Sequence, residues 1–249
     1  MTVAVPFFDF AQVLPGGFHM PARMTALPLA DAGVALVSPI PIDDALAARV
    51  EALGPVRFLI APNLLHHLYL GAAKERWPDA IVLAPSALRA KRPDLAIDAA
   101  LEDGLPPELA AGVRAIKIDG APAVEEFVFF HEASGTLVVT DLLFHVTHPR
   151  GFIAHVVLWL VGCYKRLAQS RAWRFFVKDR AAAARSARLV TGLSFERLIP
   201  AHGDVIQSGA RPQVERALAW MLAGDALVAT PGRGGAPERS RSLPRLVQK

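Results

Sequence analysis

Residues 58–67, FLIAPNLLHH, decide the fold. The apolar run at 58–61 has the length and composition of a buried β-strand, and Pro62 ends it. Asn63 is a residue type that caps helix N-termini, and the helix that it predicts ends at Trp77-Pro78. Residues 80–84 form a second apolar run. A strand, a helix and another strand in this order predict a parallel βαβ unit, with two adjacent histidines after its first strand.

The rest of the chain extends this pattern in both directions. Upstream, the turn at 30–33 joins the apolar runs 23–29 and 34–38 and predicts a hairpin. Downstream, the predicted strands are 113–118, 126–131, 136–141 and 195–200, and the predicted helices are 151–169, 178–191 and 211–223. These elements predict one α/β domain at 23–230, preceded by an N-terminal segment at 1–22 and followed by a basic tail at 231–249. We expect the tail to be disordered because it is rich in Gly, Pro and Arg.

The composition excludes a disordered or fibrous chain. Of 249 residues, 53% are apolar and 20% are charged, so enough apolar surface is present to offset the entropy cost of folding. The net charge is +4, and the five basic residues and one acidic residue of 233–249 account for all of it. The basicity therefore belongs to the tail and is not the footprint of a nucleic-acid-binding domain. We expect a small-molecule substrate and no specific nucleic acid.

Cys163 is the only cysteine in the sequence, which excludes a disulfide framework within the chain. The first ten residues contain no positive segment before an apolar run, so we expect no signal peptide and a cytoplasmic protein. The most apolar window, 151–164, is too short to cross a bilayer and predicts a core helix. The alternatives left open are a helix that contacts a second copy in a homodimer, or one that docks weakly, with the basic tail, on a membrane or other acidic surface.

Several candidate ligands follow predicted strands. The histidines are His66, His67, His131 and His202, and Asp141 ends another strand. Polar groups at the ends of several strands of an α/β sheet can converge on one edge, where such folds keep their sites. Imidazole nitrogens with a carboxylate suit zinc or ferrous iron. A single histidine at a strand end is more often structural, so the prediction depends on the whole set.

The order of these segments resembles the metallo-β-lactamase superfamily. Residues 58–67 look like its first metal motif, a strand followed by His-x-His-x-Asp-His and a helix. Residues 129–137 (FFHEASGTL) look like its later histidine segment, 137–141 (LVVTD) like the strand that delivers a bridging aspartate, and 198–204 (LIPAHGD) like its final Pro-Gly-His-Gly segment. The resemblance spans about residues 23–220. It implies an αββα sandwich with a metal site at one edge of the two sheets, and it is closest to a divergent branch with Pro-Asn-x-x-His-His as the first motif.

The departures from the motif imply a reduced site. With His67 aligned to the last histidine of the motif, Pro62 and Leu64 replace its first two histidines and His66 replaces its aspartate. Neither Pro62 nor Leu64 can bind a metal through its side chain. The resemblance therefore implies one divalent transition metal, zinc first with iron or manganese as alternatives, or no metal at all. The candidate ligands are His66, His67, His131, Asp141 and His202.

The function implied is hydrolysis of a small ester, thioester or lactone by a water that the metal activates. His66 and Asp141 are the candidate catalytic residues, and Asn63, His145 and Lys91 are the candidate substrate-binding residues. The alternative is a non-catalytic protein that keeps the fold, has lost the dinuclear site and binds a ligand or partner. Serine-hydrolase elbows and nucleotide-binding glycine loops are absent from the sequence, which supports neither of those classes.

Overall fold

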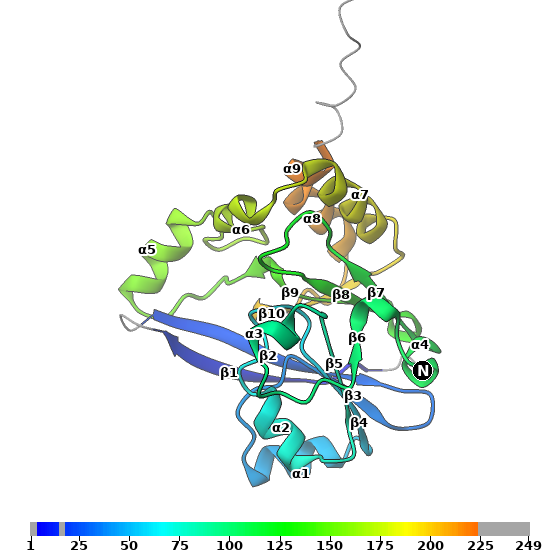
Figure 1. The fold of residues 1–249 in the computed structure, drawn as a ribbon. Helices are drawn as coiled ribbons and strands as arrows, with labels where there is room; N and C mark the ends of the chain where they lie inside the picture. Colours follow the sequence, from blue (N-terminus) through cyan, green and yellow to red (C-terminus); the bar gives the residue numbers. More distant parts are fainter. Residues whose placement is uncertain (1–3, 15–17, 224–249) are drawn as a thin grey trace, which may run out of the picture.

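Two β-sheets lie face to face in the computed structural model, which describes residues 4–14 and 18–223 (Figure 1). The first sheet contains, in spatial order, β1 (Phe7–Leu14), β2 (Phe18–Pro28), β3 (Val34–Val37), β4 (Val56–Ile60), β5 (Ile81–Ala84) and β6 (Ala99–Ala100). The second contains β10 (Arg197–Gly203), β9 (Thr136–His145), β8 (Phe127–His131) and β7 (Val113–Lys117). The strands β3, β4, β5 and β6 are parallel, as the βαβ pattern predicts.

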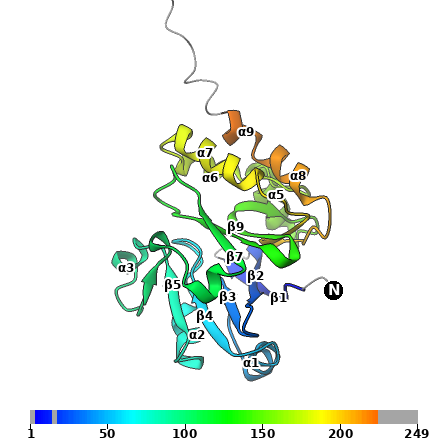
Figure 2. The same ribbon diagram turned by 90° about the vertical axis from the view of Figure 1, so that its right-hand side faces the viewer.

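Helices cover the outer face of each sheet (Figures 1 and 2). On the first sheet lie α1 (Asp44–Glu51) and α2 (Leu70–Arg76), and the short α3 (Leu88–Lys91) follows β5. On the second lie α7 (Arg180–Thr191), α8 (Ala210–Ala217) and α9 (Ala219–Leu222). The remaining helices are α4 (Pro107–Ala110), before β7, and α5 (Phe152–Leu160) and α6 (Arg171–Phe176), between β9 and α7.

The side-chain alternation of the strands builds three apolar cores. In β4, Leu59 faces the helix-covered side, while Phe58 and Ile60 face the second sheet. The residues between the sheets come from both, for example Val37 of the first and Phe129 of the second. A third core joins the second sheet to α7, α8 and α9. Helix, sheet, sheet and helix are thus the four layers, which confirms the predicted αββα sandwich.

Several details differ from the sequence expectations. The helix expected to be capped by Asn63 begins only at Leu70, with Tyr69 at its N-terminal cap. The first sheet begins at Phe7, so much of the segment 1–22 is part of it, and β1 pairs with β2 along its whole length. The helix expected over 151–169 ends at Leu160, because Gly162 adopts φ +80° in the following turn. The strand expected over 136–141 continues to His145. The hairpin of β2 and β3 is confirmed, whereas the basic tail lies outside the described residues.

Within the described residues, we find no helix with both the length and the apolar character needed to cross a bilayer.

Candidate metal centre

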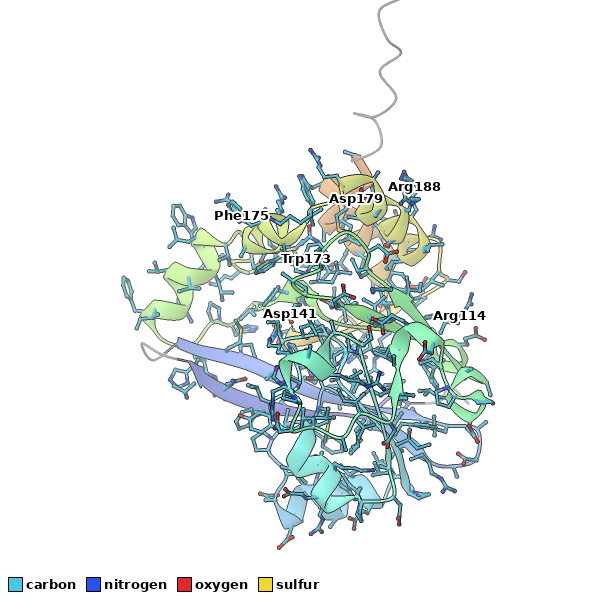
Figure 3. The ribbon with its side chains drawn as sticks, viewed as in Figure 1. Arg114, Asp141, Trp173, Phe175, Asp179 and Arg188 are labelled. Atoms are coloured by element: carbon cyan, nitrogen blue, oxygen red, sulfur yellow. The ribbon has the colours of Figure 1, made fainter. Side chains whose placement is uncertain are left out.

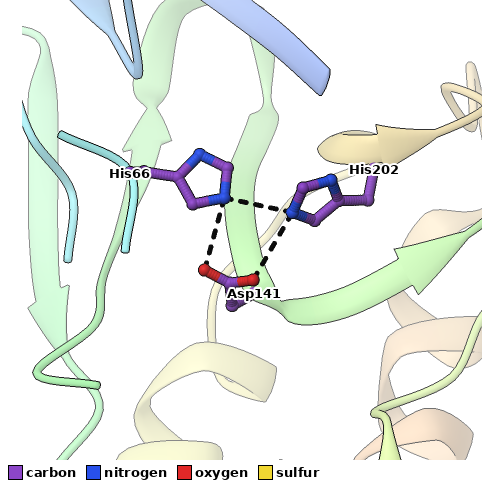
Figure 4. A group of neighbouring side chains, drawn as sticks. All are labelled: His66, Asp141 and His202. Carbon is purple, nitrogen blue, oxygen red and sulfur yellow. Dashed lines mark hydrogen bonds and ion pairs between the residues drawn. The ribbon is translucent and has the colours of Figure 1, made fainter. Parts of the chain in front are cut away.

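Three side chains from distant parts of the chain meet at one edge of the two sheets (Figure 4). His66 follows β4, Asp141 lies in β9 and His202 lies in β10. The two Nε2 atoms of the histidines are 3.0 Å apart. Asp141 places Oδ2 3.3 Å from His66 Nε2 and Oδ1 3.4 Å from His202 Nε2. The two imidazole nitrogens and the carboxylate therefore face one another, and one ligand atom from each residue lies within 4.8 Å of the other two.

Asn63 holds the loop after β4 in place. Its Oδ1 accepts hydrogen bonds from the backbone N–H groups of Leu65 and His66, which fixes the turn that presents His66. Its Nδ2 donates to Asp141 Oδ2 at 2.8 Å and to Thr140 Oγ1 at 3.1 Å. Asn63 is fully buried. Its role in the structure is to position two members of the cluster.

An irregularity in β9 directs Asp141 out of the sheet. Pro200 of β10 lies opposite Val139, but His202 lies opposite Phe144, so β9 carries extra residues between these two pairs. Such a bulge re-aims a side chain and interrupts the backbone ladder. The buried Glu126 repairs this interruption, because its Oε1 accepts hydrogen bonds from the Thr140 N–H and the Thr140 hydroxyl.

The ring of His202 is fixed on two sides. Its Nδ1 lies 2.7 Å from the carbonyl oxygen of Pro21, which can only accept, so Nδ1 carries the proton. The ring stacks on Phe144 with centroids 4.7 Å apart. In the neutral ring, Nε2 then presents its lone pair to the cluster, the form that a metal ligand needs.

The ring of His66 is oriented in a similar way by Ser38, whose Oγ lies 2.7 Å from Nδ1. Ser38 follows β3 and has φ +58°, a conformation that is costly for a residue with a Cβ. Ser38 thus contacts His66 from a strained backbone conformation beside the cluster.

The electrostatics of the cluster favour a positive charge at its centre. Burial alone raises the pKa of Asp141, but the charge of His66 and hydrogen bonds from both histidines outweigh burial and hold the pKa well below its usual range. Burial alone lowers the pKa of His202, yet the hydrogen bond and charge of Asp141 raise it overall. Asp141 is therefore an anion that draws a proton, or another cation, to the position between the rings.

The donor set fits a divalent transition metal. Ligand atoms bound about 2.05 Å from a tetrahedral ion lie about 3.3 Å from one another. In the cluster the two Nε2 atoms are 3.0 Å apart, Oδ2 of Asp141 lies 3.3 Å from Nε2 of His66, and Oδ1 lies 3.4 Å from Nε2 of His202. Two imidazoles and one carboxylate suit zinc or ferrous iron and leave coordination positions open. The residues present therefore fit one metal ion.

His67 does not join this cluster. It is buried, and its Nδ1 lies 3.0 Å from Nη1 of Arg92, which can only donate. The lone pair on Nδ1 is therefore used by Arg92. Burial and the charges of Lys91 and Arg92 lower the pKa of His67. Its neighbour His66 takes the place in the cluster, since adjacent residues in the turn point in different directions.

His131 lies at the far end of the same strand pair. It pairs with Thr136 in the antiparallel ladder of β8 and β9. Thr136 lies five residues before Asp141, which is about 16 Å along the strand. Nδ1 of His131 contacts Ser134 Oγ at 2.8 Å. β8 and β9 are consecutive in the sequence and pair with each other, but their antiparallel pairing keeps His131 away from the cluster.

The candidate substrate-binding residues His145 and Lys91 also lie elsewhere. His145 ends β9, four residues beyond Asp141, and its Nδ1 contacts the Asp204 carbonyl oxygen at 2.8 Å. Lys91 donates through Nζ to the carbonyl oxygen of Leu64 and so supports the loop before His66.

A cavity of about 340 Å³ opens onto the cluster. Its lining includes all three members of the cluster and is otherwise mainly apolar, with Met20, Ile40 and Leu68 among the contributors. Its other polar side chains are the uncharged Gln12, Ser38 and Tyr69, and no lysine or arginine lines it in the part of the chain that the structure describes.

Sequence reasoning missed several residues that build the site. Ser38, Glu126, Thr140 and Phe144 act through contacts made across the sheets, and for three of these residues the sequence has no local signal. One signal was present: Glu126 is a carboxylate at the start of an otherwise apolar strand, and a buried carboxylate needs a partner.

Comparison with known proteins identifies the fold. No protein-family model matches the chain, and no curated protein matches it. Among solved structures, a metallo-β-lactamase from Pontibacter korlensis matches with a TM-score of 0.57 and 9% identity over 89% of this chain and 96% of its own. The mono-zinc form of the metallo-β-lactamase FIM-1 from Pseudomonas aeruginosa matches with a TM-score of 0.53 and 13% identity over 92% of this chain and 98% of its own. A metal-soaked flavodiiron core, Flv1 from Synechocystis, matches with a TM-score of 0.61 and 13% identity over 91% of this chain and 60% of its own. The chain therefore has the metallo-β-lactamase fold, which is the fold that the resemblance in its sequence implies.

Proposed function

We propose that the protein is a hydrolase with one divalent transition metal ion, zinc, held by His66, Asp141 and His202. The observation that carries the proposal is the convergence of His66, Asp141 and His202 beside a cavity, with the two Nε2 atoms 3.0 Å apart and one oxygen of Asp141 3.3 to 3.4 Å from each of them. Each ligand also has a partner that orients it, namely Ser38, Asn63 and the Pro21 carbonyl group.

When bound, such a metal lowers the pKa of a water molecule and polarises a carbonyl oxygen. His66 cannot also act as a base, because Nε2 faces the cluster and Nδ1 is engaged by Ser38. Asp141 stays ionised, and its Oδ1 is not used by Asn63. That oxygen can accept a hydrogen bond from the attacking water and so orient it.

The lining of the cavity supports a neutral acyl substrate. Among the described residues no lysine or arginine lines it, so this lining offers no ammonium or guanidinium partner for a phosphate or carboxylate group. Its apolar contributors suit the hydrocarbon part of a small ester, thioester or lactone. A single metal position also favours acyl hydrolysis over phosphodiester cleavage, which usually relies on two ions.

The test is a hydrolysis screen on zinc-loaded protein with uncharged esters, thioesters and lactones. We expect turnover in the parent, a loss of at least about 100-fold in His202→Ala and Asp141→Asn, and unchanged turnover in His148→Ala, whose side chain is 92% exposed. Turnover that persists in Asp141→Asn and His202→Ala would contradict the proposal. A parent that binds metal without turning over any of the three classes would favour the non-catalytic alternative.

A further inference from the structure

The helix α5 presents a second apolar face to solvent. Ala154 and Leu158 are buried, and Leu158 belongs to a small core that includes Phe144 and Cys163. The opposite stripe is exposed and consists of large apolar residues at the spacing of one helix face: Phe152, Ile153, Val156, Trp159 and Leu160. Phe152 is 83% exposed and Trp159 is 67% exposed. Apolar side chains gathered on one exposed face mark an interaction surface.

The next helix, α6, adds to this surface. Phe175 is 80% exposed and projects outward, whereas Trp173 of the same helix points into the core (Figure 3). Both helices lie at the periphery of the molecule, with α5 beside the end of β2 that is distant from β3 (Figure 1). We call the exposed side chains of α5 together with Phe175 and Phe176 the α5–α6 face.

The charge of the segment that carries this face has one sign. Residues 142–178 contain no Asp or Glu and six cationic residues, all exposed: Arg150, Lys165, Arg166, Arg171, Arg174 and Lys178. Within the described part of the chain, none of the six forms an ion pair with a carboxylate. Arg166 and Arg171 instead donate to backbone carbonyl groups around the C-terminal end of α5.

We propose that the α5–α6 face docks on an anionic lipid surface. A short helix with exposed aromatic and aliphatic residues can insert them at the boundary between headgroups and acyl chains, while neighbouring Lys and Arg bind anionic headgroups. Trp159 suits this boundary because its ring is apolar and its indole N–H remains a donor.

The charge distribution argues against a second copy of the chain as the occupant. In a two-fold symmetric dimer the same patch meets itself, so this face would bring its cations together without carboxylates to pair them. An anionic bilayer complements both the apolar stripe and its basic surroundings.

The face is also connected to the candidate metal centre. Met20 packs against the small core beneath α5 and lines the cavity at the cluster. Phe144 belongs to the same core and stacks on His202. A membrane that binds α5 would therefore contact a helix that packs on the same core as Met20 and Phe144.

The test is sedimentation of the full chain with vesicles of phosphatidylcholine alone and of phosphatidylcholine mixed with phosphatidylserine. We expect binding to the mixed vesicles, weaker binding to phosphatidylcholine, and loss of binding at high ionic strength. The double variant Phe152→Ser, Trp159→Ser should bind at least about tenfold more weakly. The matched control is Leu189→Ser, on α7, which removes an apolar side chain that is 62% exposed and lies away from this face.

Three results would overturn the proposal. The first is equal binding of the parent and the double variant. The second is binding that disappears when 231–249 is removed but does not respond to the α5 substitutions, because the tail charge would then explain it. The third is a dimer, seen by light scattering, that the double variant converts to a monomer, because the face would then bind a second copy.

Discussion

Ser38 couples a strained backbone to the orientation of a candidate ligand. Its φ of +58° is a conformation that glycine adopts more easily, and its hydroxyl contacts His66 Nδ1 at 2.7 Å. We expect Ser38→Ala to keep the fold but to weaken metal binding about 10- to 100-fold, because partners of ligating histidines orient the ring. Competition with a chromogenic chelator measures the affinity. Ser208→Ala, at an exposed position, is the control and should bind as the parent does. Equal affinities for all three proteins would show that Ser38 has no such role.

Glu126 makes the folded protein sensitive to pH. Burial, and then the charge of Asp141, raise its pKa from 4.5 to about 7. Oε1 is bonded to Thr140, whereas Oε2 has no hydrogen-bond partner within the described residues. Between pH 4.5 and about 7, the folded state thus keeps a proton on Glu126 that the unfolded state has already released. The stability that this proton contributes is present below pH 4.5 and is lost as the pH rises to about 7.

Glu126→Gln removes this titration. Without metal, the difference in free energy of unfolding, variant minus parent, should rise by about 3 kcal/mol between pH 4.5 and about 7. Urea unfolding with a chelator present, repeated across this range, measures the difference. Glu75→Gln, at an exposed position of α2, should run parallel to the parent. A difference for Glu126→Gln that does not change with pH would contradict the assigned pKa.

Among the elements, β9 and β10 fit closely together at Gly203. Gly203 follows His202 with φ +106°, and a Cβ there would lie 2.1 Å from the carbonyl oxygen of His145. We expect Gly203→Ala to lower the free energy of unfolding by at least about 2 kcal/mol, because both the backbone conformation and the contact oppose it. Gly112→Ala is the matched control, since a Cβ at that position meets nothing within 4 Å. Denaturant unfolding of both variants measures the effect, and equal midpoints would contradict this reading of the β9–β10 junction.

The elements also show where local sequence patterns stop being informative. The apolar run and Pro62 correctly predict β4, because a buried parallel strand is a continuous apolar stretch. The end of β9 is wrong by four residues, because Asp141 sits in a bulge inside the strand and not at its end. A polar residue in an apolar run has two explanations, a strand end or a bulge, and only the partner strand decides between them.

In the molecule as a whole, the layers follow from sequence but the site depends on contacts between distant segments. The alternation of strands and helices predicts the sandwich, since each face must be covered. Which of two adjacent histidines enters the cluster depends on the direction of each side chain in the turn, and His67 points to Arg92, 25 residues further along the chain, which donates to its Nδ1 atom. The exclusion of His131 was accessible in principle, because a hairpin of β8 and β9 places His131 and Asp141 far apart.

The most direct test of a metal centre built from His66, Asp141 and His202 is the metal content of the purified protein, measured by mass spectrometry for zinc, iron and manganese. The structure predicts about one metal ion per chain in the parent and in His67→Ala, and none in His66→Ala or His202→Ala. A metal-free parent after growth with all three metals would contradict the account. So would a metal that is lost in His67→Ala and retained in His66→Ala.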